Sequence, residues 1–302
     1  MNKKVKGIIA GIIAAVSYGT NNLGALSLYE EGLNPNSIIF FRYLFAVAIL
    51  GIILLCKKES FRVSFKELRT IASLGILFAL SSLSLYFSFK YMDSGVASTI
   101  LFAYPVMVAI IMAVFFKEKT TLSTILAIVL SALGIILLYQ GDGNVSLSLW
   151  GVILVLISSL TYAIYIVIVN HSKIVMSSFK QTFYTMIFGS LTVFVASLFQ
   201  TDTHIQCIPS ISALMWILEL SLVPTVIALV LLTISVQNVG STPAAILGAL
   251  EPVTAVIISI VIFDGLFTSR LMIGIILVIL SVVLIILGKS IDGKFKHKKL
   301  DY

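Results

Sequence analysis

Three charged side chains lie inside long apolar segments of this sequence. Glu251 stands beside Pro252 between two uncharged runs, and Arg42 and Glu219 each lie near one end of an apolar segment. A charge at the centre of a membrane helix costs about 2.5–3.5 kcal/mol on insertion scales, so such residues tend to be functional. Glu251 is the first candidate for chemistry. Desolvation disfavours the charged form of a carboxyl, so Glu251 could take up a proton and later release it.

Alternative interpretations exist for each of these charges. Glu251 could be a protonated carboxyl that hydrogen bonds to a neighbouring helix. For Arg42 the sequence favours a structural tether, whose long side chain would snorkel to the membrane surface. Arg42 and Glu219 are predicted at the same depth, so an ion pair between them could also close one side of a cavity in one conformation.

Two prolines occupy equivalent places in the sequence. Pro105 and Pro252 each lack a backbone donor and free the carbonyl four residues earlier, at Leu101 and Gly248. Freed carbonyls are tolerated in a membrane where they face protein or a water-filled cavity. They can bind substrate or let the helix bend, and the alternative is a static kink. The matched positions favour a hinge or a cavity.

Polar side chains deep in apolar segments are further candidates for binding. Tyr18 and Asn22 form an i,i+4 pair on one face of a predicted helix. Tyr104 and Tyr162 also lie deeper than the interface, where tyrosines usually serve as anchors. We expect these four residues, with the Gly248 carbonyl, to line a substrate cavity beside the proton-carrying carboxyl.

The elements that must position these residues are apolar runs. Of the 302 residues, 59% are hydrophobic and 11% are charged, against roughly 25% charged in soluble proteins. Each run is long enough to cross a hydrocarbon core roughly 30 Å thick. The sequence predicts an all-α integral membrane protein with ten transmembrane helices, at 7–28, 36–56, 70–89, 94–116, 121–140, 149–170, 181–200, 212–236, 241–263 and 269–288.

The charge distribution indicates the topology. The formal net charge is +7, and most of the 20 Lys and Arg residues fall on one side of the ten spans. The positive-inside rule then places both termini in the cytoplasm, in a multi-pass protein of the cytoplasmic membrane. The basic charge is therefore a signal of orientation in the lipid bilayer, and we expect no nucleic-acid partner.

Short matches recur in the same order along the chain. Gly7-Ile8 returns as Gly151-Val152, and Tyr104-Pro105-Val106 returns as Glu251-Pro252-Val253. This pattern predicts two five-helix repeats, 1–143 and 144–302, the second with a short basic cytoplasmic tail. Five spans is an odd number, so the repeats would be inverted in the membrane. Inverted repeats build many secondary transporters, with the substrate site near the midplane.

The sequence resembles EamA-type members of the drug/metabolite transporter superfamily. The resemblance rests on Arg42 early in the second span, the Pro-Val pair of the fourth, the Glu-Pro-Val of the ninth, and Phe116-Lys117-Glu118 with Thr120-Thr121-Leu122. The second copy of the last motif, Phe263-Asp264-Gly265, has Gly where the family often has Glu. The resemblance implies ten helices around a central cavity and transport of small metabolites by alternating access.

Enzyme and cofactor signatures are absent from the sequence. Its three histidines lie in separate loops or the tail, its two cysteines are unsuited to a metal site, and no P-loop, dinucleotide fingerprint or Gly-x-Ser-x-Gly motif occurs. We therefore expect no enzyme activity, no metal and no cofactor.

The sequence predicts a secondary active transporter, coupled to protons, for a small metabolite such as an amino acid or a drug-like compound. One alternative is a non-transporting sensor or the partner subunit of a lipid-modifying system. The duplication disfavours a partner subunit, which is often one half as long. A channel would require rings of like residues around its pore.

The predicted topology is tested by cysteine labelling of intact cells. A membrane-impermeant maleimide added outside should label Cys207, or a cysteine placed at Gly143, because both would lie in outer loops. It should not reach a cysteine placed at Ser64, which would lie in a cytoplasmic loop. Outside labelling at position 64 would contradict the inverted arrangement.

Overall fold

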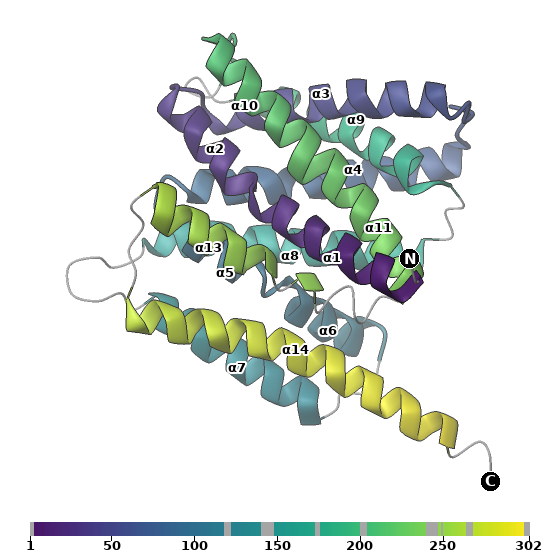
Figure 1. The fold of residues 1–302 in the computed structure, drawn as a ribbon, viewed down its shortest axis with the longest axis vertical. Helices are drawn as coiled ribbons and strands as arrows, with labels where there is room; N and C mark the ends of the chain where they lie inside the picture. Colours follow the sequence, from purple (N-terminus) through teal and green to yellow (C-terminus); the bar gives the residue numbers. More distant parts are fainter. Residues whose placement is uncertain are drawn as a thin grey trace.

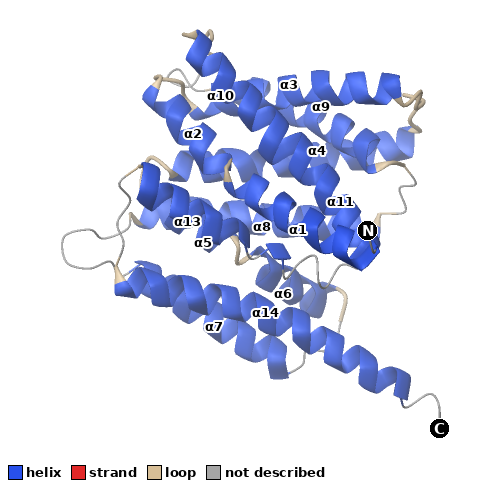
Figure 2. Cartoon of the chain, in the orientation of Figure 1, coloured by secondary structure: helices blue, strands red, loops and turns tan. Residues whose placement is uncertain are grey.

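The computed structural model describes residues 3–117, 122–139, 148–172, 176–199, 204–239, 247–248, 250–263 and 268–298. Within these ranges the regular structure is entirely helical (Figure 2). The all-α prediction is confirmed for this part of the chain. Positions Glu118 and Asp264 of the family resemblance lie outside it.

The first five predicted spans are seven helices in the structure. The first and fourth spans are each divided in two, whereas the other three are continuous. In chain order the helices are α1 (Lys3–Gly19), α2 (Asn21–Glu30), α3 (Pro35–Cys56), α4 (Phe65–Ser88), α5 (Ser94–Leu101), α6 (Tyr104–Phe115) and α7 (Leu122–Tyr139).

The second half of the chain has an equivalent series. Its eighth predicted span contains a π-helical turn, η2, between two α-helices. The elements are α8 (Leu149–His171), α9 (Ser178–Ser197), α10 (Ile211–Ser221), η2 (Leu222–Ile227), α11 (Ala228–Val239), α13 (Leu250–Ile262) and α14 (Ser269–Lys298). The ninth predicted span, 241–263, lies partly outside the described residues.

One boundary differs clearly from the prediction. The tenth span was expected to end at residue 288 and to continue as a basic tail, but α14 extends to Lys298. The segment 289–298 contains no proline and has four lysines, which favour a helix. The lysines of the expected tail therefore do not stop the helix.

Many of the described helices are long and apolar enough to cross a membrane. Three shorter apolar helices, 125–137, 250–262 and 269–284, accompany them. The chain is thus a multi-pass membrane protein. By length and composition, six described segments are long and apolar enough to cross a membrane: Lys3–Glu30, Pro35–Cys56, Phe65–Ser88, Ser94–Phe115, Leu149–Val169 and Ile211–Leu232.

Local sequence sets where several helices begin. The Asn34 side chain accepts a hydrogen bond from the Ser37 amide, and Pro35 occupies the first position of α3, where its missing donor costs nothing. At α4, Ser64 and Glu67 form a reciprocal capping box. Polar residues between the apolar runs thus fix the ends of the helices.

The helices of the two halves pack against each other in a regular scheme (Figure 1). Large contacts join α3 with α9, α5 with α13, α7 with α14, α1 with α11, and α4 with α8. If each helix is replaced by its equivalent in the other half, the first three of these pairs stay the same. The last two pairs change places. The two halves therefore contribute equivalent surfaces to one interface.

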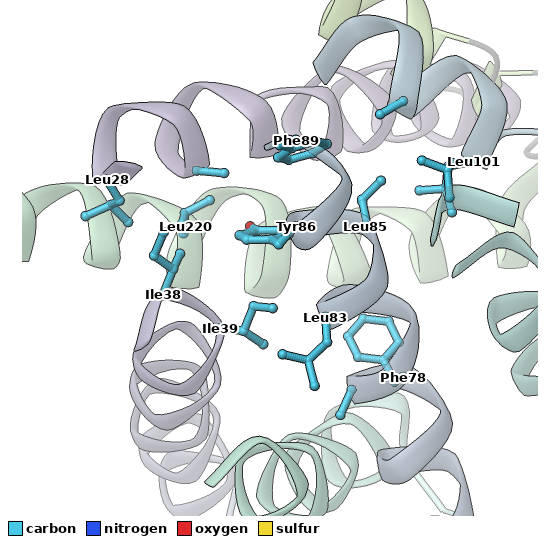
Figure 3. Packing of buried hydrophobic residues seen from close by; sticks show 14 of the residues in the cluster. Leu28, Ile38, Ile39, Phe78, Leu83, Leu85, Tyr86, Phe89, Leu101 and Leu220 are labelled. Carbon is cyan, nitrogen blue, oxygen red and sulfur yellow. The ribbon is translucent and has the colours of Figure 1, made fainter. Parts of the chain in front are cut away.

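Buried apolar side chains from helices of both halves form one cluster (Figure 3). The fully buried Tyr86 of α4 is at its middle, with its ring stacked on Phe89 at a centroid distance of 5.5 Å. Leu28 of α2, Ile39 of α3 and Leu220 of α10 belong to the same cluster. Helices from both halves therefore fix the position of the Tyr86 hydroxyl.

Candidate functional site

A small cavity lies where α1 and α2 meet α4, α5 and α13. Its volume is about 10 Å³, which is room for about one water molecule. The structure thus holds the site in a closed form. The cavity brings together the predicted residues Tyr18, Asn22 and Glu251, and its full lining is Tyr18, Gly19, Asn21, Asn22, Leu85, Ser98, Leu101, Glu251 and Ala255.

Glu251 is a partly buried carboxylate on the first turn of α13. Within the described part of the chain, no hydrogen bond or ion pair to this carboxylate is found. Gly19 allows the close approach of α1, because a Cβ there would lie 2.9 Å from the Glu251 carbonyl oxygen. The absence of a side chain at Gly19 therefore brings the carboxylate next to Tyr18.

Tyrosine rings of α6 and α8 pack against one another near this carboxylate. The Tyr104 and Tyr162 rings meet edge to face, with centroids 4.7 Å apart, and Tyr162 stacks on Tyr165 at 5.8 Å. Of the three predicted tyrosines, Tyr18 lines the same cavity as Glu251. Tyr104 and Tyr162 are not among the residues that line the closed cavity.

Asn22 joins the first span to the fourth. Its Nδ2 donates to the Ser94 carbonyl and to Ser98 Oγ, both at 3.0 Å. Asn22 is 1% exposed, so these bonds form in a dry contact. They hold α2 against α5 along one wall of the cavity. Asn22, which was predicted to bind substrate, therefore links α2 to α5 in this structure.

The prolines have different local surroundings. Pro105 does not kink a continuous helix: the helix stops at Phe102–Ala103, and Pro105 lies in the first turn of the new helix α6. The Leu101 carbonyl, predicted to be freed, accepts a hydrogen bond from Ser159 Oγ at 3.2 Å. Pro252 is buried in α13.

Gly248 lies one turn before Pro252 in an open part of the structure. A Cβ added at Gly248 would meet nothing within 4 Å. Gly248 is not among the residues lining the closed cavity. Its role in substrate binding remains a prediction.

Arg42 does not snorkel to the surface, contrary to the favoured interpretation of the sequence. It is 3% exposed, and its guanidinium donates to polar groups on three other elements. Nη1 donates to Asn21 Oδ1 at 2.6 Å and to the Tyr86 hydroxyl at 3.2 Å, and Nε donates to Thr225 Oγ1 at 2.9 Å. The expectation failed because the interior supplies three oxygen acceptors, which compensate for the lost hydration.

The π-helical turn η2 creates one of these acceptors. Pro224 cannot donate to the Leu220 carbonyl, and the Thr225 hydroxyl donates to it instead, at 2.8 Å. Thr225 Oγ1 then accepts from Arg42. The proline-induced irregularity of η2 thus positions the hydroxyl that binds the arginine.

Glu219 has a different partner from Arg42 in this structure. Its Oε1 accepts from Thr20 Oγ1 at 3.0 Å, while its buried Oε2 has no hydrogen-bond partner in the described part. Gly24 makes room for the carboxylate, because a Cβ there would lie 2.5 Å from Oε2. The direct pair of Arg42 with Glu219 stays a prediction for another conformation.

Several site residues were not identified from the sequence. Asn21, Tyr86, Thr225 and Ser98 were not among the candidates proposed from the sequence. Thr225 directly follows Pro224 inside an apolar run, which is a usable signal for an irregular turn. Tyr86 and Ser98 carry no comparable signal. The described residues also contain no group of three His, Cys, Asp or Glu side chains that could hold a metal ion.

Comparison with known proteins gives a family match along both halves. The sequence model of the EamA-like transporter family matches residues 5–140 and again residues 149–287. An uncharacterized transporter of Archaeoglobus fulgidus is 24% identical over 163 residues, which are 54% of this chain and 56% of the relative. The aligned part of the chain thus spans about half the length of this curated relative.

A solved structure is similar over nearly the whole chain. The match, a crystal structure of a protein, has a TM-score of 0.66 and 14% sequence identity, and covers 93% of this chain and 96% of the other. At this identity the likeness concerns the fold alone.

The Arg42 network predicts an unequal effect of two Arg-to-Lys substitutions. Arg42→Lys keeps the charge but cannot reproduce the planar set of donors, so about 2 kcal/mol of stability should be lost. We expect a fall of about 4–8 °C in the melting temperature of the purified protein. The control, Arg69→Lys on the exposed face of α4, should change it little. Equal melting temperatures for the two variants would show that the network does not stabilise the structure.

Proposed function

Because the chain belongs to the EamA-like transporter family, it is a membrane transporter, and we propose that it is a secondary active one driven by protons. It moves a small polar or amphiphilic metabolite, such as an amino acid or a drug-like compound, across the cytoplasmic membrane. The mechanism is alternating access: a central site opens to one side and then to the other.

One observation carries the proposal of proton coupling. Glu251 is placed in the central cavity with Tyr18 and Asn22, and the described residues offer its carboxylate no hydrogen bond or counter-ion. A structural carboxyl in a membrane usually has such a partner, whereas a transport site needs a group that can exchange its proton for substrate. Glu251 binds the proton on one side and releases it on the other.

The surroundings of Glu251 favour a substrate that carries an amino group. An ammonium group is attracted by the carboxylate and by the faces of tyrosine rings, and Tyr18, Tyr104 and Tyr162 are close to Glu251. Proton and ammonium group then compete for one carboxylate, which links the two transport steps. The freed Gly248 carbonyl, in its open surroundings, is an additional acceptor for the substrate.

The conformational change uses the two halves, 1–143 and 144–302, as inverted five-helix repeats of a ten-helix protein. Their equivalent pairing in the interface supports this assignment. The interruptions at Thr20 and at Phe102–Ala103 are the hinges. The contact of Asn22 with Ser94 and Ser98 closes the outer side of the cavity. This contact must break before substrate passes. Both termini lie in the cytoplasm in this arrangement.

Substitution of Glu251 tests the coupling directly. Glu251→Gln keeps the shape and the hydrogen-bonding capacity of the side chain but cannot titrate. In liposomes with an imposed pH gradient, we expect accumulation of a transported compound to fall to the level of protein-free liposomes. Exchange of the compound down its own gradient should persist, because the cavity is intact. Transported compounds are found first by a thermal-shift screen of amino acids, sugars, nucleosides and cationic drugs.

The control is Glu30→Gln, which removes an exposed carboxylate at the end of α2. This variant should accumulate the compound like the wild-type protein. If Glu251→Gln also accumulates it against a gradient, with the wild-type dependence on pH, then Glu251 is structural and is not the proton carrier.

A further inference from the structure

A second and much larger cavity lies away from Glu251, between α3, α9 and α11. Its volume is about 540 Å³, within the range of roughly 300–1,000 Å³ of small-molecule sites. The residues that line it are all different from those of the Glu251 cavity. The proposed transport cycle does not use this space.

The cavity has an apolar interior and a polar mouth. The interior is lined by Leu50 of α3, Val226 of η2, and Val230 and Ile234 of α11. Leu50 and Val226 are only 2% and 4% exposed, so this part reaches the core of the protein. A ligand that fills it must carry a hydrocarbon portion.

The mouth is rich in positive charge. Lys57 and Glu59 line the mouth itself, and the segments 57–62 and 176–180 carry three further cations beside it, Lys58, Arg62 and Lys180. Glu59 accepts a hydrogen bond from Ser177 Oγ at 2.5 Å, so part of its capacity is used within the protein. The mouth therefore favours an anionic group.

Lys57 is held at this mouth in a defined position. Its Nζ lies 3.7 Å from the centre of the Phe179 ring, a cation–π contact that leaves the donors on the other side of the ammonium group available. Lys57 is the cap of α3 and Ser177 is the cap of α9. The mouth thus lies where two apolar helices leave the hydrocarbon, at the level of lipid headgroups.

We propose that this cavity binds one phospholipid of the adjacent leaflet. Its phosphate contacts Lys57, and an acyl chain lies along Val226, Val230 and Ile234. A lipid with net negative charge, such as phosphatidylglycerol, binds more tightly than a zwitterionic one because the mouth carries excess positive charge. The site depends only on the membrane location of the chain, and not on the nature of the transported compound.

Lipid in this cavity would also act on the central network. Val226 lies in η2 directly after Thr225, which accepts the hydrogen bond from Arg42. An acyl chain packed on Val226 therefore supports the turn that positions Thr225. Bound lipid stabilises the closed arrangement seen here, and its effect is measurable as a rise in melting temperature.

The test compares the melting temperature of the purified full-length protein in detergent with increasing phosphatidylglycerol or phosphatidylcholine of identical acyl chains. Lys57→Gln removes the charge at the mouth, and Val230→Trp fills the apolar interior. Lys90→Gln is the matched control, because this lysine also lies near an aromatic ring, Phe87, but beyond the opposite end of α4.

We expect phosphatidylglycerol to stabilise the wild-type protein and Lys90→Gln equally, and more than phosphatidylcholine does. The apparent affinity of Lys57→Gln for phosphatidylglycerol should be about fivefold weaker, and Val230→Trp should show no saturable shift. If Val230→Trp elutes as an aggregate, the comparison of Lys57→Gln with Lys90→Gln decides alone.

Equal affinity of wild type, Lys57→Gln and Lys90→Gln for phosphatidylglycerol would overturn the proposal, because the lipid would then act only through the general charge of the basic face. A concentration-dependent dimer that Val230→Trp abolishes would also overturn it, since a second copy of the chain would then fill the cavity. Both measurements report binding, so a failure of the proton-coupling hypothesis would leave their interpretation unchanged.

Discussion

Inside a bilayer, the protein itself must satisfy every backbone donor and acceptor, and this constraint determines where its helices can be irregular. At the break after Gly19, the Thr20 hydroxyl donates to the Ser17 carbonyl. At the break in the fourth span, Ser159 donates to the Leu101 carbonyl, and in η2 Thr225 donates to the Leu220 carbonyl. Each irregular turn is thus stabilised by a hydroxyl, and these turns supply polar groups to an otherwise apolar interior.

The buried arginine depends on these same groups. Arg42 is held by Asn21, which begins α2 after the first break, by Thr225 in η2, and by Tyr86. The Tyr86 hydroxyl also donates to Asn21 Oδ1 at 2.9 Å, so the acceptors are held in place by one another. Elements of both halves meet at one cation. Each bond from the charged guanidinium to a neutral oxygen contributes about 1.5–3 kcal/mol, so together they stabilise this arrangement of the helices.

The sequence predicted the parts of this structure that follow from local patterns. Apolar run length gave the helices, and the proline spacing correctly identified Leu101 as a carbonyl that needs a partner. Tyr18, Asn22 and Glu251 were expected in one cavity and do line one together. Helix periodicity and the missing donor of a proline act within a few residues, whereas the roles of Tyr18, Asn22 and Glu251 stay predictions.

The remaining features depend on contacts between distant segments. The break at Thr20 directly follows Gly19, and it is accompanied by a bond to Glu219, 199 residues away in sequence. Arg42 was expected to snorkel because its acceptors come from three elements that the sequence does not show to be adjacent. Asn22 was expected to bind substrate, and its bonds to Ser94 and Ser98 appear only when α2 packs on α5. The larger cavity likewise lies between residues of distant segments, from α3, α9, η2 and α11.

We propose that the cavity beside Glu251 opens to each side of the membrane in turn. Ala255, 1% exposed on its wall, is the place to measure this. Ala255→Cys is introduced with Cys56 and Cys207 replaced by Ser, and the rate of modification by an impermeant thiol reagent is recorded in right-side-out and inside-out vesicles. We expect modification from both sides, slowed on both by a transported compound. Modification from one side only, or from neither, would contradict it.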